Sequence, residues 1–66
     1  MNEREKAVYE WLFHERARIG ALVLDYEAGR RKVGRFEEGQ LIDETEQEIS
    51  NLKQRIAQIG MLMADF

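Results

Sequence analysis

The second half of the chain carries a heptad repeat that continues to its last residue. Its positions are Ile42, Thr45, Ile49, Leu52, Ile56, Ile59, Met63 and Phe66. Polar and charged residues fill most of the positions between them. This spacing places the apolar side chains on one narrow stripe of a helix, which is stable in water only when another helix covers it. The repeat therefore predicts a helix that packs against a second helix, of the same chain or of another.

A chain of 66 residues can build only a small core. At this length folding buries about 60% of the surface of the unfolded chain, so stability is marginal without a crosslink, a metal or a partner. The absence of cysteine and the single histidine exclude disulfides, thiolate sites and most histidine ligand sets. We therefore expect no cofactor and no metal, and we expect oligomerisation to supply the missing stability.

The charge pattern narrows the class of partner. The net charge of −3, with both signs interspersed, argues against a general nucleic-acid binder. No apolar run approaches the ~18 residues that span a bilayer, and no signal-peptide stretch follows Met1. The sequence predicts a cytoplasmic protein that does not bind membranes.

Two helices and a joint account for the whole chain. Proline is absent, and Asn2 followed by Glu5 is typical of a capping box at a helix start. We expect helices over residues 3–28 and 41–64, with a joint at residues 29–40. The joint contains the glycines Gly29, Gly34 and Gly39. These elements predict a single all-α domain, an antiparallel helical hairpin that assembles into a four-helix bundle dimer.

The first helix has two apolar faces, although a two-helix hairpin needs only one. The broad stripe is Val8, Trp11, Leu12, Ile19, Leu22, Val23 and Tyr26. A second face, nearly opposite, is Phe13, Ala17, Gly20, Ala21, Leu24 and Ala28. Folding the chain about residue 34 pairs the broad stripe with the heptads. It sets Ile19 near Ile49 and Glu15 beside Lys53.

The second face is the candidate surface for self-association, through Ala17, Gly20, Ala21, Leu24 and Ala28. An interior glycine such as Gly20 costs a helix about 1 kcal/mol relative to alanine unless close packing returns it. The alternative interpretation is that these residues are good helix formers on a half-exposed face. We favour a homodimer, because the domain is small.

The end of the hairpin away from the joint is the candidate partner-binding site. Aromatic residues and methionines gather there, namely Trp11, Phe13, Met61, Met63 and Phe66. Such clusters are typical of binding hot spots. The alternative, equally open, is that these residues close the end of an oligomer core.

The joint carries a basic run, Arg30, Arg31, Lys32 and Arg35, which offers a possible grip on phosphates. Acidic residues occupy the same third of the chain, so compensation of the helix C-terminus explains the run better. His14 with Glu10 and Glu15 lacks the spacing of a metal or acid–base site.

The sequence contains no nucleophile motif and no phosphate-binding glycine loop, so we expect no enzymatic activity and no small-molecule substrate. It predicts a protein–protein interaction module that acts as an adaptor, a co-chaperone or an inhibitor of an unidentified protein partner. The alternative is a nucleic-acid-binding regulator that uses the basic joint.

Overall fold

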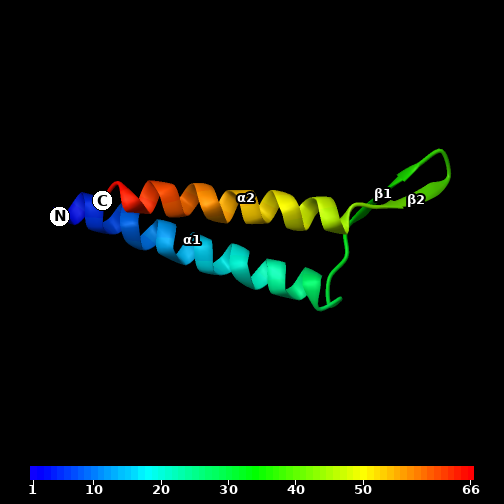
Figure 1. The fold of residues 1–66 in the computed structure, drawn as a ribbon, viewed down its shortest axis with the longest axis horizontal. Helices are drawn as coiled ribbons and strands as arrows, with labels where there is room; N and C mark the ends of the chain where they lie inside the picture. The colour runs from blue at the N-terminus through cyan, green and yellow to red at the C-terminus, as the bar shows by residue number, and fades with distance from the viewer.

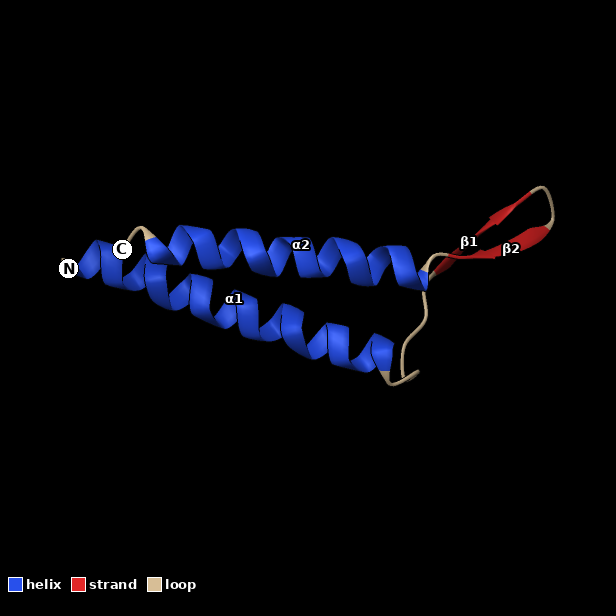
Figure 2. Cartoon of the chain, in the orientation of Figure 1, coloured by secondary structure: helices blue, strands red, loops and turns tan.

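The computed structural model describes residues 1–66 as two long helices joined by a β-hairpin. The elements in chain order are α1 (Glu3–Glu27), β1 (Gly34–Glu37), β2 (Gln40–Asp43) and α2 (Thr45–Ala64). The helices run antiparallel, so both termini lie at one end of the molecule (Figure 1). The β-hairpin projects beyond the opposite end (Figure 2).

The prediction of an all-α fold is wrong, because residues 34–43 form a two-stranded antiparallel sheet. The second helix begins at Thr45 rather than at residue 41, and Leu41 to Asp43 belong to β2. The helical hairpin itself is present. Its first helix ends at Glu27, next to the predicted end, and its second ends at Ala64 as predicted.

The β-hairpin follows from a tight turn at residues 38 and 39. Glu38 and Gly39 both have positive φ, 53° and 78°, as a two-residue turn of type I′ requires. Phe36 then lies opposite Leu41, and Arg35 opposite Ile42. The apolar residues at these positions suit a pleated strand better than one more helical turn.

Gly34 allows the two strands to approach closely where they leave the helices. A Cβ atom at this position would lie 2.7 Å from the backbone oxygen of Ile42. A side chain is therefore excluded at residue 34 unless the backbone moves. This glycine marks the base of the hairpin.

Thr45 fastens the hairpin to α2. Its hydroxyl oxygen accepts a hydrogen bond from the Val33 N–H at 3.1 Å and donates to the Val33 carbonyl at 3.3 Å. The Thr45 N–H donates to Asp43 Oδ1 at 2.9 Å, which satisfies one of the free N–H groups at the helix start. Hydrogen bonding from the Thr45 side chain and backbone lowers the pKa of Asp43, and the charge of Lys32 acts in the same direction.

Thr45→Val should loosen this junction while leaving the helices intact. The variant keeps the shape of the side chain but removes both hydrogen bonds to Val33, at a cost of about 1–2 kcal/mol. We expect faster amide hydrogen exchange in β1 and β2. Thr45→Ser retains the hydroxyl and serves as the control. Unchanged exchange in Thr45→Val would show that the hydroxyl does not hold the hairpin.

The core lies between the two helices and is small. Six side chains are buried: Leu12, Ile19, Val23, Leu52, Ile59 and Met63. Tyr9, Leu22, Tyr26, Ile49 and Ile56 pack against them. The broad stripe of α1 therefore packs on the heptads of α2 as the sequence predicts. Trp11 and Val8 are exceptions, since both are exposed.

The register between the helices differs from the predicted one, because residues of α1 meet residues that come later in the chain than folding about residue 34 places there. Tyr9 stacks edge-to-face on Phe66, with ring centroids 6.1 Å apart, whereas folding about residue 34 sets Tyr9 beside Ile59. Lys53 pairs with Glu27 at 3.3 Å instead of with Glu15. Glu15 pairs with Arg18 on its own helix.

Candidate functional site

Several exposed apolar side chains lie toward the end of the molecule that holds both termini. Trp11 comes from α1 and is 62% exposed. Met61, Leu62 and Phe66 come from the last turns of α2 and the residues after it, and are 73%, 53% and 44% exposed. We call these four residues the terminal patch. The fold brings them to one end because the helices are antiparallel (Figure 1).

Two residues of the predicted partner site lie elsewhere. Met63 is 7% exposed and belongs to the core, while its neighbour Leu62 is exposed in its place. Phe13 is 48% exposed but lies about 200° around α1 from Trp11, since successive residues are about 100° apart. Arg16 covers the Phe13 ring, with its guanidinium carbon 5.8 Å from the ring centroid. Met63 is therefore part of the core, and Phe13 is left out of the terminal patch because Arg16 covers its ring.

A hollow lies at the C-terminal end of α2. Its lining residues are Gln58, Met61, Leu62 and Asp65. Two of them, Met61 and Leu62, belong to the terminal patch.

The residues predicted for self-association remain uncovered in the single chain. Ala17, Ala21, Leu24 and Ala28 are exposed, and Leu24 is 64% exposed. A Cβ atom at Gly20 would meet no other atom within 4 Å. Nothing within one copy therefore requires glycine at residue 20.

Ion pairs neutralise half of the basic run. Arg30 pairs with Asp25 at 2.9 Å, and Arg35 pairs with Glu37 at 2.8 Å and also with Glu44. Arg31 and Lys32 have no ion pair. The four cations thus do not form one concentrated positive site for phosphates.

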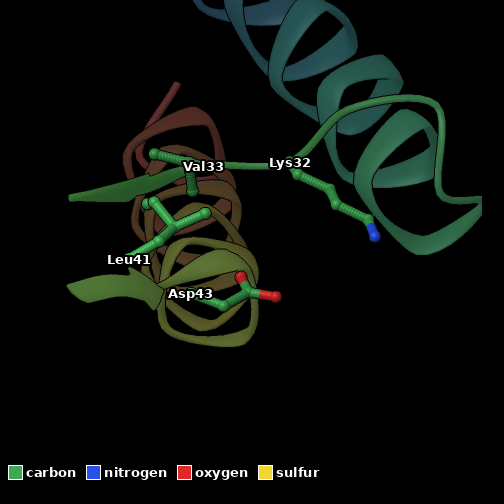
Figure 3. Close-up of a pocket in the computed structure, with 5 residues that line it drawn as sticks. Lys32, Val33, Leu41 and Asp43 are labelled. Carbon is green, nitrogen blue, oxygen red and sulfur yellow. The ribbon is translucent and has the colours of Figure 1, made fainter. Parts of the chain in front are cut away.

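A second hollow lies where the chain enters the β-hairpin. Val33, Gly34 and Leu41 line it, together with Lys32 and Asp43 (Figure 3). The Lys32 and Asp43 side chains point to the same side, and the lysine charge contributes to the low pKa of Asp43. Beyond this hollow, Phe36 is 80% exposed and Leu41 67% exposed. Sequence reasoning missed both residues, because Glu38–Gly39 is not one of the dipeptides that signal a two-residue hairpin turn.

His14 makes an edge contact with the Phe13 ring, with centroids 5.6 Å apart. No group of three His, Asp or Glu side chains is close enough to hold a metal ion. Neither helix combines the length and the apolar character needed to cross a lipid bilayer. No protein-family model, curated protein or solved structure matches the chain.

Proposed function

We propose that the protein is a non-enzymatic protein–protein interaction module that works as a dimer of helical hairpins. The observation that carries this proposal is the imbalance between core and surface. The fold buries six side chains and leaves ten large hydrophobic side chains exposed. Four of these ten form the terminal patch. A small fold that leaves more large apolar side chains exposed than it buries has surface available for a partner.

The terminal patch is the surface we assign to the partner protein. It combines one tryptophan and one phenylalanine with a flexible methionine, residue types that are enriched in protein–protein interfaces. The chemistry of the patch suits an apolar groove or an amphipathic helix. An adaptor, a co-chaperone or an inhibitor acting in the cytoplasm fits this surface.

Affinity capture from the native host, with and without nuclease, tests the proposal against nucleic-acid binding. We expect the chain to retain a protein partner after nuclease treatment. Loss of all captured material on nuclease treatment would instead favour the basic joint. The ion pairs of Arg30 and Arg35 weigh against that result.

The dimer is assigned to the exposed face of α1. Gly20→Leu should weaken association by about 1–3 kcal/mol, because a large side chain forces apart two closely packed helices. Gly60→Leu is the matched control, since a Cβ atom at Gly60 also meets nothing within 4 Å. Sedimentation equilibrium measures both variants after circular dichroism confirms their helix content. An unchanged dimer in Gly20→Leu would place the interface elsewhere.

A further inference from the structure

The apolar residues on the exposed face of α1 have the same spacing in both directions along the helix. Its apolar positions are Phe13, Ala17, Gly20, Ala21, Leu24 and Ala28. The separations are four, three, one, three and four residues, a sequence that is unchanged when it is reversed. The centre of this symmetry lies between Gly20 and Ala21. A face with its own two-fold symmetry is the kind of surface that pairs with a second copy of itself.

Side-chain size alternates about that centre. When two copies of α1 cross antiparallel at the centre, Phe13 lies level with Ala28 of the second copy. Leu24 likewise lies level with Ala17 of the second copy. Each large side chain thus meets a small one, and at the centre Gly20 meets Ala21. This alternation lets two helices approach closely without a clash.

The charges beside this face have the same symmetry. Glu10 lies three residues before Phe13, and Arg31 lies three residues after Ala28, just beyond the end of α1. Both residues are exposed, and neither forms an ion pair within the chain. An antiparallel crossing brings Glu10 to the C-terminal end of α1 of the second copy, which Arg31 follows by four residues, and it does so at both ends of the interface.

A parallel crossing has none of these advantages. It sets Glu10 beside Glu10 and Arg31 beside Arg31, so that like charges repel at both ends. It also stacks Phe13 on Phe13 and leaves a gap where alanines meet. The helix dipoles favour the antiparallel arrangement as well, because opposite ends then lie together.

We propose that two copies of the chain pair antiparallel through the outer faces of α1, about a two-fold axis between Gly20 and Ala21. Glu10 of each copy then forms an ion pair with Arg31 of the other. This inference rests on the proposed dimer and specifies its geometry. The β-hairpins project from opposite ends of the assembly. The residues of the terminal patch are not part of this interface.

Charge reversal with rescue tests the geometry. Glu10→Arg and Arg31→Glu should each weaken the dimer by about tenfold or more, because every dimer contains the ion pair twice. The double variant, Glu10→Arg with Arg31→Glu, should restore an affinity close to that of the unmutated chain. The two single variants shift the net charge in opposite directions, so a general charge effect cannot weaken both. Sedimentation equilibrium at low salt provides the affinities.

Exposed residues away from the face provide the controls. Glu46→Arg on α2 and Arg4→Glu near the N-terminus make the same charge changes and should leave the affinity unchanged. If neither single variant changes the affinity of the dimer, the antiparallel geometry is wrong but the proposed dimer is unaffected. A monomeric unmutated chain overturns both. Weakening without rescue in the double variant also counts against the Glu10–Arg31 contact.

Discussion

Ile19→Ala is expected to lower the free energy of unfolding by about 2–5 kcal/mol. Ile19 has 0% exposure and is the most deeply buried side chain in the molecule. Its truncation removes apolar contacts and opens a cavity between the two helices. The core has only six buried residues, so it has little other packing with which to compensate. Urea denaturation followed by circular dichroism, at fixed protein concentration, measures the change.

Leu41→Ala is the matched control for this loss. Leu41 lies in the β-hairpin and is 67% exposed, so its truncation should change the stability by less than about 1 kcal/mol. If Ile19→Ala were as mild as Leu41→Ala, the two helices would not share the core described above.

The second large effect concerns the terminal patch. Trp11→Ala combined with Phe66→Ala should weaken partner binding by upwards of ~2 kcal/mol, which is at least about thirtyfold in affinity. Both residues offer aromatic surface, and Trp11 is 62% exposed in the single copy. Neither residue is one of the six buried side chains, although Phe66 also contacts Tyr9, so the stability of the variant is measured first. Titration of the captured partner against the variant measures the loss.

The comparison variant removes the three arginines of the basic run instead. Arg30→Ala, Arg31→Ala and Arg35→Ala together should leave partner binding largely intact and change mainly its salt dependence. Both variants are first checked for helix content and for association, because Arg31 also forms the proposed contact with Glu10 of the second copy. If the arginine variant loses the partner while the aromatic variant keeps it, the partner binds at the joint and not at the terminal patch.

The helices and their core could be predicted from the sequence because periodicity encodes them directly. The capping pair at the start of α1 appears in the structure, where the Glu5 N–H donates to Asn2 Oδ1 at 2.8 Å. The heptad residues Leu52, Ile59 and Met63 are buried as expected. Spacing at three and four residues specifies which face is covered, and the structure confirms that face.

The same periodicity could not specify the register. Sliding one helix past the other by a heptad presents the same stripe to the core, so the pattern is satisfied in both positions. The connection between the helices decides the matter. Residues 34–43 leave the helical path as a β-hairpin, so α2 begins at Thr45 and Lys53 reaches Glu27. The two-residue turn at Glu38 and Gly39 leads into β2. Ile42 therefore lies in a strand, although it continues the heptad spacing.

Only part of the candidate site could be predicted from the sequence. The clustering of Trp11, Met61 and Phe66 at one end depends on the antiparallel topology alone, which the sequence predicts. The heptad spacing places Met63 in the core and leaves Leu62 outside it, as the structure shows. Pattern reasoning assigned Met63 to the heptad stripe and to the partner site together, and the structure places it in the core.

Sedimentation equilibrium of the unmutated chain at micromolar concentration measures whether a second copy covers the apolar face of α1. If one hairpin of 66 residues is incomplete without that copy, we expect a reversible dimer whose population falls on dilution. A single species with the mass of one chain throughout the micromolar range would contradict it.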